Sequence, residues 1–145
     1  MSVDKYELGE KMIALASQYR QMGDNLSITA FKQFTAGKIT KDEYDELHHK
    51  AEEIFNQASA IHREVAGLTA DSIETDLKGI ENATEELEKA ADRVKQINNI
   101  INISIETITA IGTVVLACTT PNPATISAAV ESTKTLADDI IKMTS

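Results

Sequence analysis

One stretch of the sequence, residues 99–130, carries a single formal charge, on Glu106, although the segments on either side are rich in Lys, Glu and Asp. Such a stretch can fold as a buried helix, as a pair of strands or as a segment that enters a membrane. Each outcome removes the apolar side chains from water in a different way. The structure of this stretch therefore constrains the fold and the function more than any other feature of the chain.

The polar residues of this stretch favour a helix over strands. Ile101, Ile103 and Ile105 alternate with polar residues, as they would in a half-buried strand. The polar side chains nevertheless recur at steps of three and four, as on one face of a helix: Asp92, Lys95, Asn99, Asn102, Glu106, Thr109 and Thr113. We therefore expect this stretch to be helical.

The apolar residues before this stretch share its register. They recur in a heptad-like pattern: Ile73, Leu77, Ile80, Leu87, Ala91, Val94, Ile101, Ile105, Ile108 and Val115. Because no proline and no strong capping residue interrupts the pattern, it predicts one very long helix over about 70–117. Such a helix would be about 70 Å long at 1.5 Å per residue. The pair Asn98-Asn99 marks the place where it could bend.

The N-terminal part of the chain shows an amphipathic pattern with one interruption. Its apolar stripe consists of Leu8, Met12, Leu15, Tyr19, Met22 and Leu26. The triplet Gly23-Asp24-Asn25 combines residues that favour turns. We therefore expect a helix over 3–22, a break at this triplet, and a short helical segment over 27–36.

Two helix starts carry strong capping signals. Thr40 followed by Glu43 has the spacing of a capping box, which predicts a helix over 41–66. Asn122-Pro123 combines a good N-cap residue with a proline at the first helical position. This pair predicts a last helix over 123–143.

Together these segments predict an all-α fold in a single domain, residues 1–145. We expect an elongated antiparallel bundle of four main helices, one of them very long. After Ile97 the flanks of the long helix fill with apolar residues. Since the shorter helices reach only one end of it, the far half needs cover from other helices, a partner chain or lipid.

The composition excludes some partners. There are 23 acidic and 14 basic residues, a net charge of -9, which disfavours binding to nucleic-acid phosphates and to anionic lipid. The single cysteine, Cys118, forms no internal disulfide. The N-terminus is charged from Asp4 on and lacks the apolar core of a signal peptide. We expect a cytoplasmic protein, with secretion by a signal-independent route left open.

The candidates for catalysis are weak. Glu46 and His49 have the Glu-x-x-His spacing of di-metal bundles, but Ser59 stands where a second such motif, ending at His62, needs its Glu. Cys118 lies in an apolar run with no His nearby in sequence. We therefore predict no enzyme activity, no cofactor and no metal site. A metal-dependent helical-bundle enzyme remains the second alternative.

The leading interpretation is a non-catalytic helical interaction protein. It associates with itself or with another helical protein through the apolar end of the last two helices. The predicted interface residues are Ile101, Ile105, Ile108, Val115, Ile126 and Val130.

The first alternative is a membrane-active protein that inserts the hairpin 97–141. The window Ile100–Cys118 approaches the length and hydropathy of a membrane span, but Asn102 and Glu106 lie inside it. Membrane contact is therefore expected only after a conformational change. A sequestered apolar hairpin among long helices resembles the general plan of α-helical pore-forming toxins, although no motif specific to that class is present.

Overall fold

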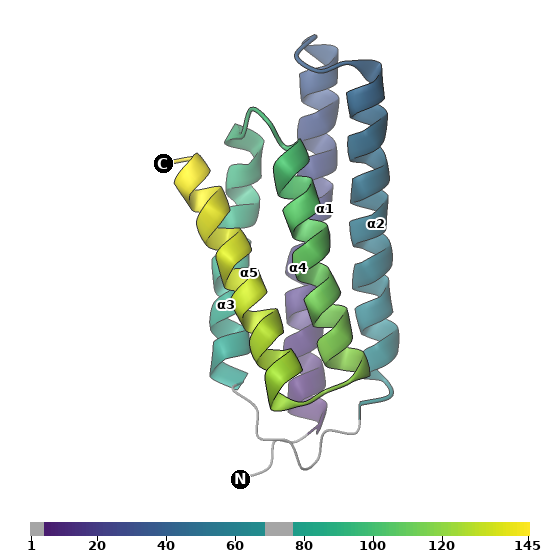
Figure 1. Ribbon diagram of the computed structural model, residues 1–145, viewed down its shortest axis with the longest axis vertical. Helices are drawn as coiled ribbons and strands as arrows, with labels where there is room; N and C mark the ends of the chain where they lie inside the picture. The colour runs from purple at the N-terminus through teal and green to yellow at the C-terminus, as the bar shows by residue number, and fades with distance from the viewer. Residues whose placement is uncertain (1–4, 69–76) are drawn as a thin grey trace.

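A computed structural model describes residues 5–68 and 77–145 of this protein. They form five α-helices and one short 3-10 helix: α1 (Lys5–Thr35), α2 (Lys41–Val65), α3 (Leu77–Arg93), η1 (Val94–Gln96), α4 (Ile101–Thr119) and α5 (Pro123–Met143). Successive helices run in opposite directions (Figure 1). The predicted all-α antiparallel bundle is confirmed, with five helices in place of four main ones.

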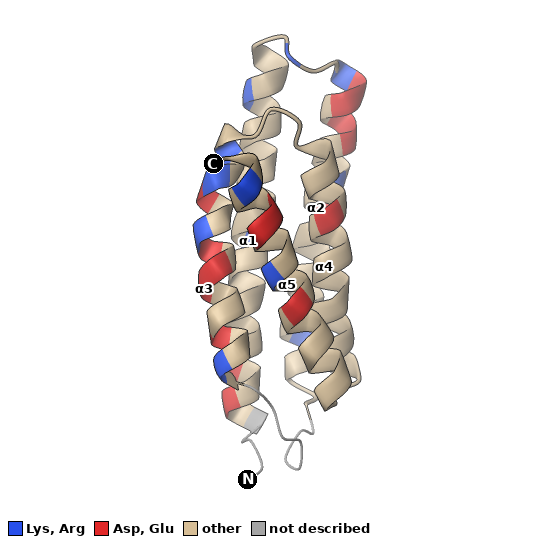
Figure 2. Ribbon diagram, turned by 60° about the vertical axis from the view of Figure 1, so that its left-hand side comes forward, with Lys and Arg blue, Asp and Glu red and all other residues tan. Residues whose placement is uncertain are grey.

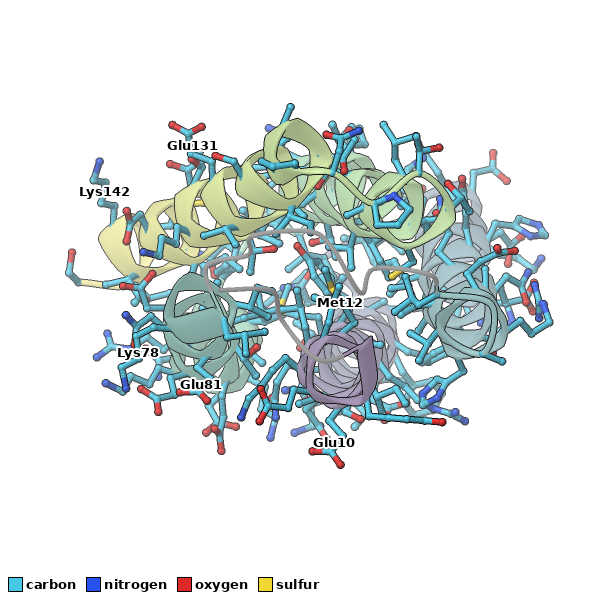
Figure 3. The ribbon with its side chains drawn as sticks, turned by 90° about the horizontal axis from the view of Figure 1, so that it is seen from below. Glu10, Met12, Lys78, Glu81, Glu131 and Lys142 are labelled. Atoms are coloured by element: carbon cyan, nitrogen blue, oxygen red, sulfur yellow. The ribbon has the colours of Figure 1, made fainter. Side chains whose placement is uncertain are left out.

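The helices are arranged in two layers. Helices α3, α1 and α2 form one layer, with α1 in the middle, and α5 and α4 form the other (Figures 1 and 3). Contacts follow a closed ring in which α1 packs on α2, α2 on α4, α4 on α5, α5 on α3 and α3 on α1. Figure 3 shows Met12 pointing into the space between the layers, while Glu10 and Glu131 point outwards. The apolar core thus lies between the two layers.

Helix α1 is continuous, so the predicted break at Gly23-Asp24-Asn25 is wrong. The predicted helices 3–22 and 27–36 are one helix; residues 3 and 4 lie outside the described part. The whole apolar stripe of α1 is buried. Gly23 lets α2 approach closely, because a Cβ atom there would lie 3.0 Å from Phe55 Cε1 and 3.2 Å from Ile54 Cγ2. The glycine therefore serves helix packing and not a turn.

The predicted very long helix over 70–117 is also wrong in its described part. Helix α3 ends at Arg93, η1 adds one turn, and the chain reverses before α4 begins at Ile101. Ile97 already has an extended backbone, with φ -86° and ψ 130°. Residues 70–76 of that prediction lie outside the described residues. The helical prediction for the stretch after Asn99 is confirmed by α4.

Hydrogen bonds from other parts of the chain explain the reversal. Asn25 Nδ2 donates to the backbone oxygen of Ala91 at 2.8 Å, and Gln33 Nε2 donates to that of Ile97 at 2.9 Å. Both bonds are buried, so α1 replaces water as the partner of carbonyls near the end of α3. Asn99 Oδ1 accepts a hydrogen bond from Ile101 N at 3.2 Å at the start of α4.

Both predicted caps are confirmed. Thr40 Oγ1 accepts from Glu43 N at 3.1 Å and Thr40 N donates to Glu43 Oε1 at 2.9 Å. Asn122 Oδ1 accepts from Thr125 N at 2.9 Å, with proline in the first turn of α5. These bonds satisfy backbone groups that a helix start otherwise leaves free, so α2 and α5 begin where the sequence indicates.

We expect Gly23→Ala to lower the free energy of unfolding by about 1–2 kcal/mol, because the methyl group would crowd Phe55 and Ile54. Gly67→Ala, just after α2, is the matched control, since the nearest atom to a Cβ placed there is Glu64 O at 3.6 Å, an ordinary van der Waals distance. Alanine restricts the unfolded chain more than glycine does, so the control is expected to be neutral or slightly stabilising. Urea unfolding of both variants measures the difference. Equal effects of the two substitutions would contradict this account of Gly23.

Candidate interaction surface

The outward side of α4 carries exposed apolar side chains beside the exposed polar side chains of Asn102 and Thr109. Ile105 is 47% exposed and Leu116 is 52% exposed, and Gly112 between them faces open space. Ile101, Ile108 and Val115 lie at the edge of this side, where they are partly buried and pack in part against the core. We call this set of six residues the α4 face: Ile101, Ile105, Ile108, Gly112, Val115 and Leu116. The spacing of three and four residues places them along one side of the helix.

The hydroxyl groups of α4 are satisfied within the helix itself. All five serine and threonine hydroxyls of α4 donate to backbone oxygens three or four residues earlier: Ser104 to Ile101, Thr107 to Ile103, Thr109 to Ile105, Thr113 to Ala110 and Thr119 to Leu116. A hydroxyl bonded in this way already donates to a backbone oxygen, so its hydrogen keeps a partner when water is displaced from the helix surface. The helix can therefore meet an apolar partner without leaving these donors unpaired.

Glu106 is the only charged side chain of α4. It lines a groove of about 390 Å³ between α4 and α5, together with Glu131, Ser132 and Thr135. Burial raises the pKa of Glu106 to about 7, and a hydrogen bond with the Asp139 carboxyl and its negative charge contribute in the same direction. Glu106 therefore holds its proton to a much higher pH than an ordinary glutamate.

The structure distributes the six predicted interface residues over two helices. Four of them, Ile101, Ile105, Ile108 and Val115, share the α4 face. Val130 is half-buried on α5, and Ile126 on α5 is buried in the core.

Two members of the α4 face were not predicted, and the predicted register is the reason. The heptad pattern placed Ile101, Ile105, Ile108 and Val115 in one register with the apolar residues of α3. In the structure the buried side of α4 is instead formed by Ile103, Ser104, Thr107, Ala110, Ile111, Val114, Ala117 and Cys118. Because the chain reverses before α4, its register is independent of α3. The wide apolar flank containing Leu116 was the signal that α4 buries a different side.

The candidates for chemistry are not brought together. His48 Nε2 lies 3.1 Å from Glu52 Oε1 and His49 Nδ1 lies 3.9 Å from Glu52 Oε2, all on the exposed side of α2. Within residues 5–68 and 77–145 no group of three or more His, Cys, Asp or Glu side chains could hold a metal ion. Cys118 is buried, and burial, with a smaller effect of Glu64, raises the pKa of its thiol to about 12.

Among the described helices, α4 alone is long and apolar enough to cross a membrane. Less than half of this helix is buried inside the protein. Core helices of soluble proteins meet the same criteria of length and composition, so these criteria do not distinguish a membrane span from a core helix. It does set α4 apart from its neighbours.

We expect Glu106 to make the protein less stable as the pH rises from about 5 to about 7.5. The folded pKa of about 7 exceeds the ordinary value of 4.5, so the stabilising effect of the proton is fully present below about pH 4.5 and is lost as the pH rises through 7. Solvent screening at this partly exposed groove limits the change to about 1–2 kcal/mol. Glu106→Gln removes this part of the pH dependence.

Chemical unfolding at pH 5.0, 6.0, 7.0 and 8.0 measures the effect. Glu131→Gln is the matched control, because Glu131 lines the same groove but is exposed. The control is expected to follow the pH profile of the unmodified protein. Parallel profiles for Glu106→Gln and the unmodified protein would show that Glu106 titrates normally.

Comparison of the chain with protein-family models, with curated proteins and with solved structures gave no significant match.

Proposed function

We propose that this protein is a non-catalytic interaction protein that self-associates through the α4 face. The observation that carries the proposal is the line of apolar side chains on this helix, with Ile105 and Leu116 about half exposed and open space in front of Gly112. Exposed apolar residues that lie on one helix face are typical of contact surfaces between helices. Burying them against a partner would remove apolar area from water.

The charge distribution leaves the α4 face free of the repulsion that acts between two copies elsewhere. The protein has a net charge of -9, so two copies repel each other over most of their surface. Residues 107–130 contain no charged side chain. In Figure 2 the ribbon of α4 is tan over most of its length, whereas α3 alternates between blue and red. Two copies that meet through their α4 faces bring no like charges together at the centre of the contact.

The shape of the α4 face fits a two-fold contact between identical helices. In such a contact the same patch serves both partners, so a central small residue brings the two backbones close. Gly112 lies between Ile105 and Leu116 and would occupy that crossing point. The apolar side chains on either side of it would then pack against those of the partner helix.

The test is the oligomeric state of Ile105→Glu beside that of Ile28→Glu. Ile28 lies on α1 and is 46% exposed, so it matches Ile105 in residue type and exposure but lies outside the α4 face. We expect the unmodified protein to dimerise in sedimentation equilibrium. A buried charge at Ile105 should raise the dissociation constant at least tenfold, which corresponds to about 1.4 kcal/mol.

Circular dichroism would establish that both variants keep their helix content. A protein that stays monomeric up to millimolar concentration would refute self-association. Equal weakening by Ile28→Glu would show that general surface hydrophobicity, and not the α4 face, causes association.

A second candidate function is a membrane-active protein that inserts α4 at mildly acidic pH. Two observations favour it: the length and apolar composition of α4, and the raised pKa of its only charged side chain. Protonation of Glu106 would leave α4 uncharged, which lowers the cost of transfer into lipid. The internally bonded hydroxyls of α4 would lower that cost further.

Dye release from phosphatidylcholine vesicles between pH 5.0 and 8.0 tests this second candidate. Leakage is expected below about pH 7, and Glu106→Gln is expected to shift its onset to higher pH because it removes the ionisable group. Glu131→Gln should leave the onset unchanged. Intact vesicles at every pH, with no protein bound to them, would rule the candidate out.

A further inference from the structure

The exposed residues of α4 lie on one line along the helix. Together with Gly112, which is partly buried, they recur at alternating steps of three and four residues: Asn102, Ile105, Thr109, Gly112, Leu116 and Thr119. This is the spacing of the contact line between two paired helices. We call these six residues the α4 stripe. A second helix that packs on α4 therefore lies along the α4 stripe.

Glu106 lies on one of the two flanks of the α4 stripe. The first flank is apolar and consists of Ile101, Ile108 and Val115, and the second consists of Glu106 and Thr113; all five residues are partly buried. In paired helices the residues on both flanks of the contact line lie against the partner helix. A second copy that packs along the α4 stripe therefore covers part of the exposed surface of Glu106.

Glu106 has acidic neighbours on α5 and no cation to neutralise it. Glu131 lines the same groove, and a hydrogen bond joins the carboxyl groups of Glu106 and Asp139. Within residues 5–68 and 77–145 none of these three carboxyl groups forms an ion pair with a Lys, Arg or His side chain. The two lysines of α5, Lys134 and Lys142, do not line the groove, and Figure 3 shows Lys142 pointing outwards. These neighbours favour the neutral form of Glu106.

The other helices packed against α4 bring no unpaired charge to Glu106. Helix α4 also packs on α2 and, less extensively, on α1. Over residues 6–65, the charged side chains of these two helices are exposed in all but four cases. Each of the four has a partner: Lys11 pairs with Glu81, Glu43 with Thr40 N, Asp45 with Lys41 and Lys50 with Glu46. Among the described charged groups, Asp139 is therefore the one that acts on the Glu106 carboxyl.

We propose that protonation of Glu106 controls self-association through the α4 face, a regulation that rests on the function proposed above. Packing a second copy along the α4 stripe removes water from Glu106 in both copies. An ionised carboxylate would lose hydration there without gaining a cation, whereas a neutral carboxyl keeps its hydrogen bond with Asp139. Each Glu106 that is ionised in the free protein therefore takes up a proton when two copies associate.

The control operates near neutral pH. Burial and Asp139 raise the pKa of Glu106 to about 7 in the free protein, and cover by a second copy raises this pKa further. The affinity between copies is therefore highest below about pH 6, where Glu106 is neutral in both states, and falls as the pH rises through about 7 and 8. An ordinary glutamate is already ionised above about pH 5 and would not respond in this range.

Sedimentation equilibrium of the full chain at pH 6.0, 7.0, 8.0 and 8.5 tests the proposal, in 1 M sodium chloride to shorten the range of the net charge to about 3 Å. We expect the dissociation constant at pH 8.5 to be at least tenfold higher than at pH 6.0. Glu106→Gln should keep the value of pH 6.0 at every pH. Glu131→Gln is the matched control, because it removes the same charge from the same groove at an exposed position, and it should keep the tenfold change. The histidines of α2 are common to all three proteins.

Dilution calorimetry of the unmodified protein at pH 7.5, in two buffers with different heats of ionisation, counts the protons without any variant. Uptake of about one proton per dimer is expected, and uptake of none would overturn the proposal. Dimers of equal strength at every pH would also overturn it and leave the α4 face as an interface. A pH dependence that persists in Glu106→Gln would assign the control to another group and overturn the role of Glu106. A protein that is monomeric at every pH would refute self-association and this regulation with it.

Discussion

Two buried hydrogen bonds from α1 bind the chain at the end of α3 and just after η1, where it reverses direction. The side-chain amides of Asn25 and Gln33 donate to the carbonyls of Ala91 and Ile97, where α3 gives way to η1 and to an extended residue. Without these donors, carbonyls buried against α1 would lack partners, and the helix would gain by continuing. Their presence allows the chain to reverse. The reversal in turn places α4 in the second layer, between α2 and α5.

The closed ring of five helices explains why one face of α4 is left open. Helix α1 lies in the middle of the layer of three, and its apolar stripe is buried. A buried hydrogen bond of 2.7 Å between Tyr19 Oη and Thr133 Oγ1 joins α1 to α5 across the two layers. Within residues 5–68 and 77–145 the second layer contains only α4 and α5, so no further described helix covers the outward side of α4. The same two-layer arrangement thus produces both a well-packed core and an exposed apolar surface.

Local signals in the sequence predicted local structure well, and long-range contacts account for the errors. The capping residues of α2 and α5, the apolar stripe of α1 and the helical period of α4 all act within a few residues, and each prediction is confirmed. Gly23 looked like a break because its role depends on Ile54 and Phe55 of α2. The end of α3 was missed because the hydrogen-bond donors for Ala91 O and Ile97 O lie 66 and 64 residues earlier in the chain.

Residues 107–130 carry no charge in a chain with a net charge of -9, so the negative charge of the molecule is unevenly distributed along the chain. Repulsion between two copies acts over a distance set by dissolved ions, about 10 Å at 0.1 M salt and about 3 Å at 1 M. Contact between apolar side chains has no comparable range and is little affected by such screening. Added salt would therefore favour encounters between copies of this protein, whereas it weakens the attraction between oppositely charged partners.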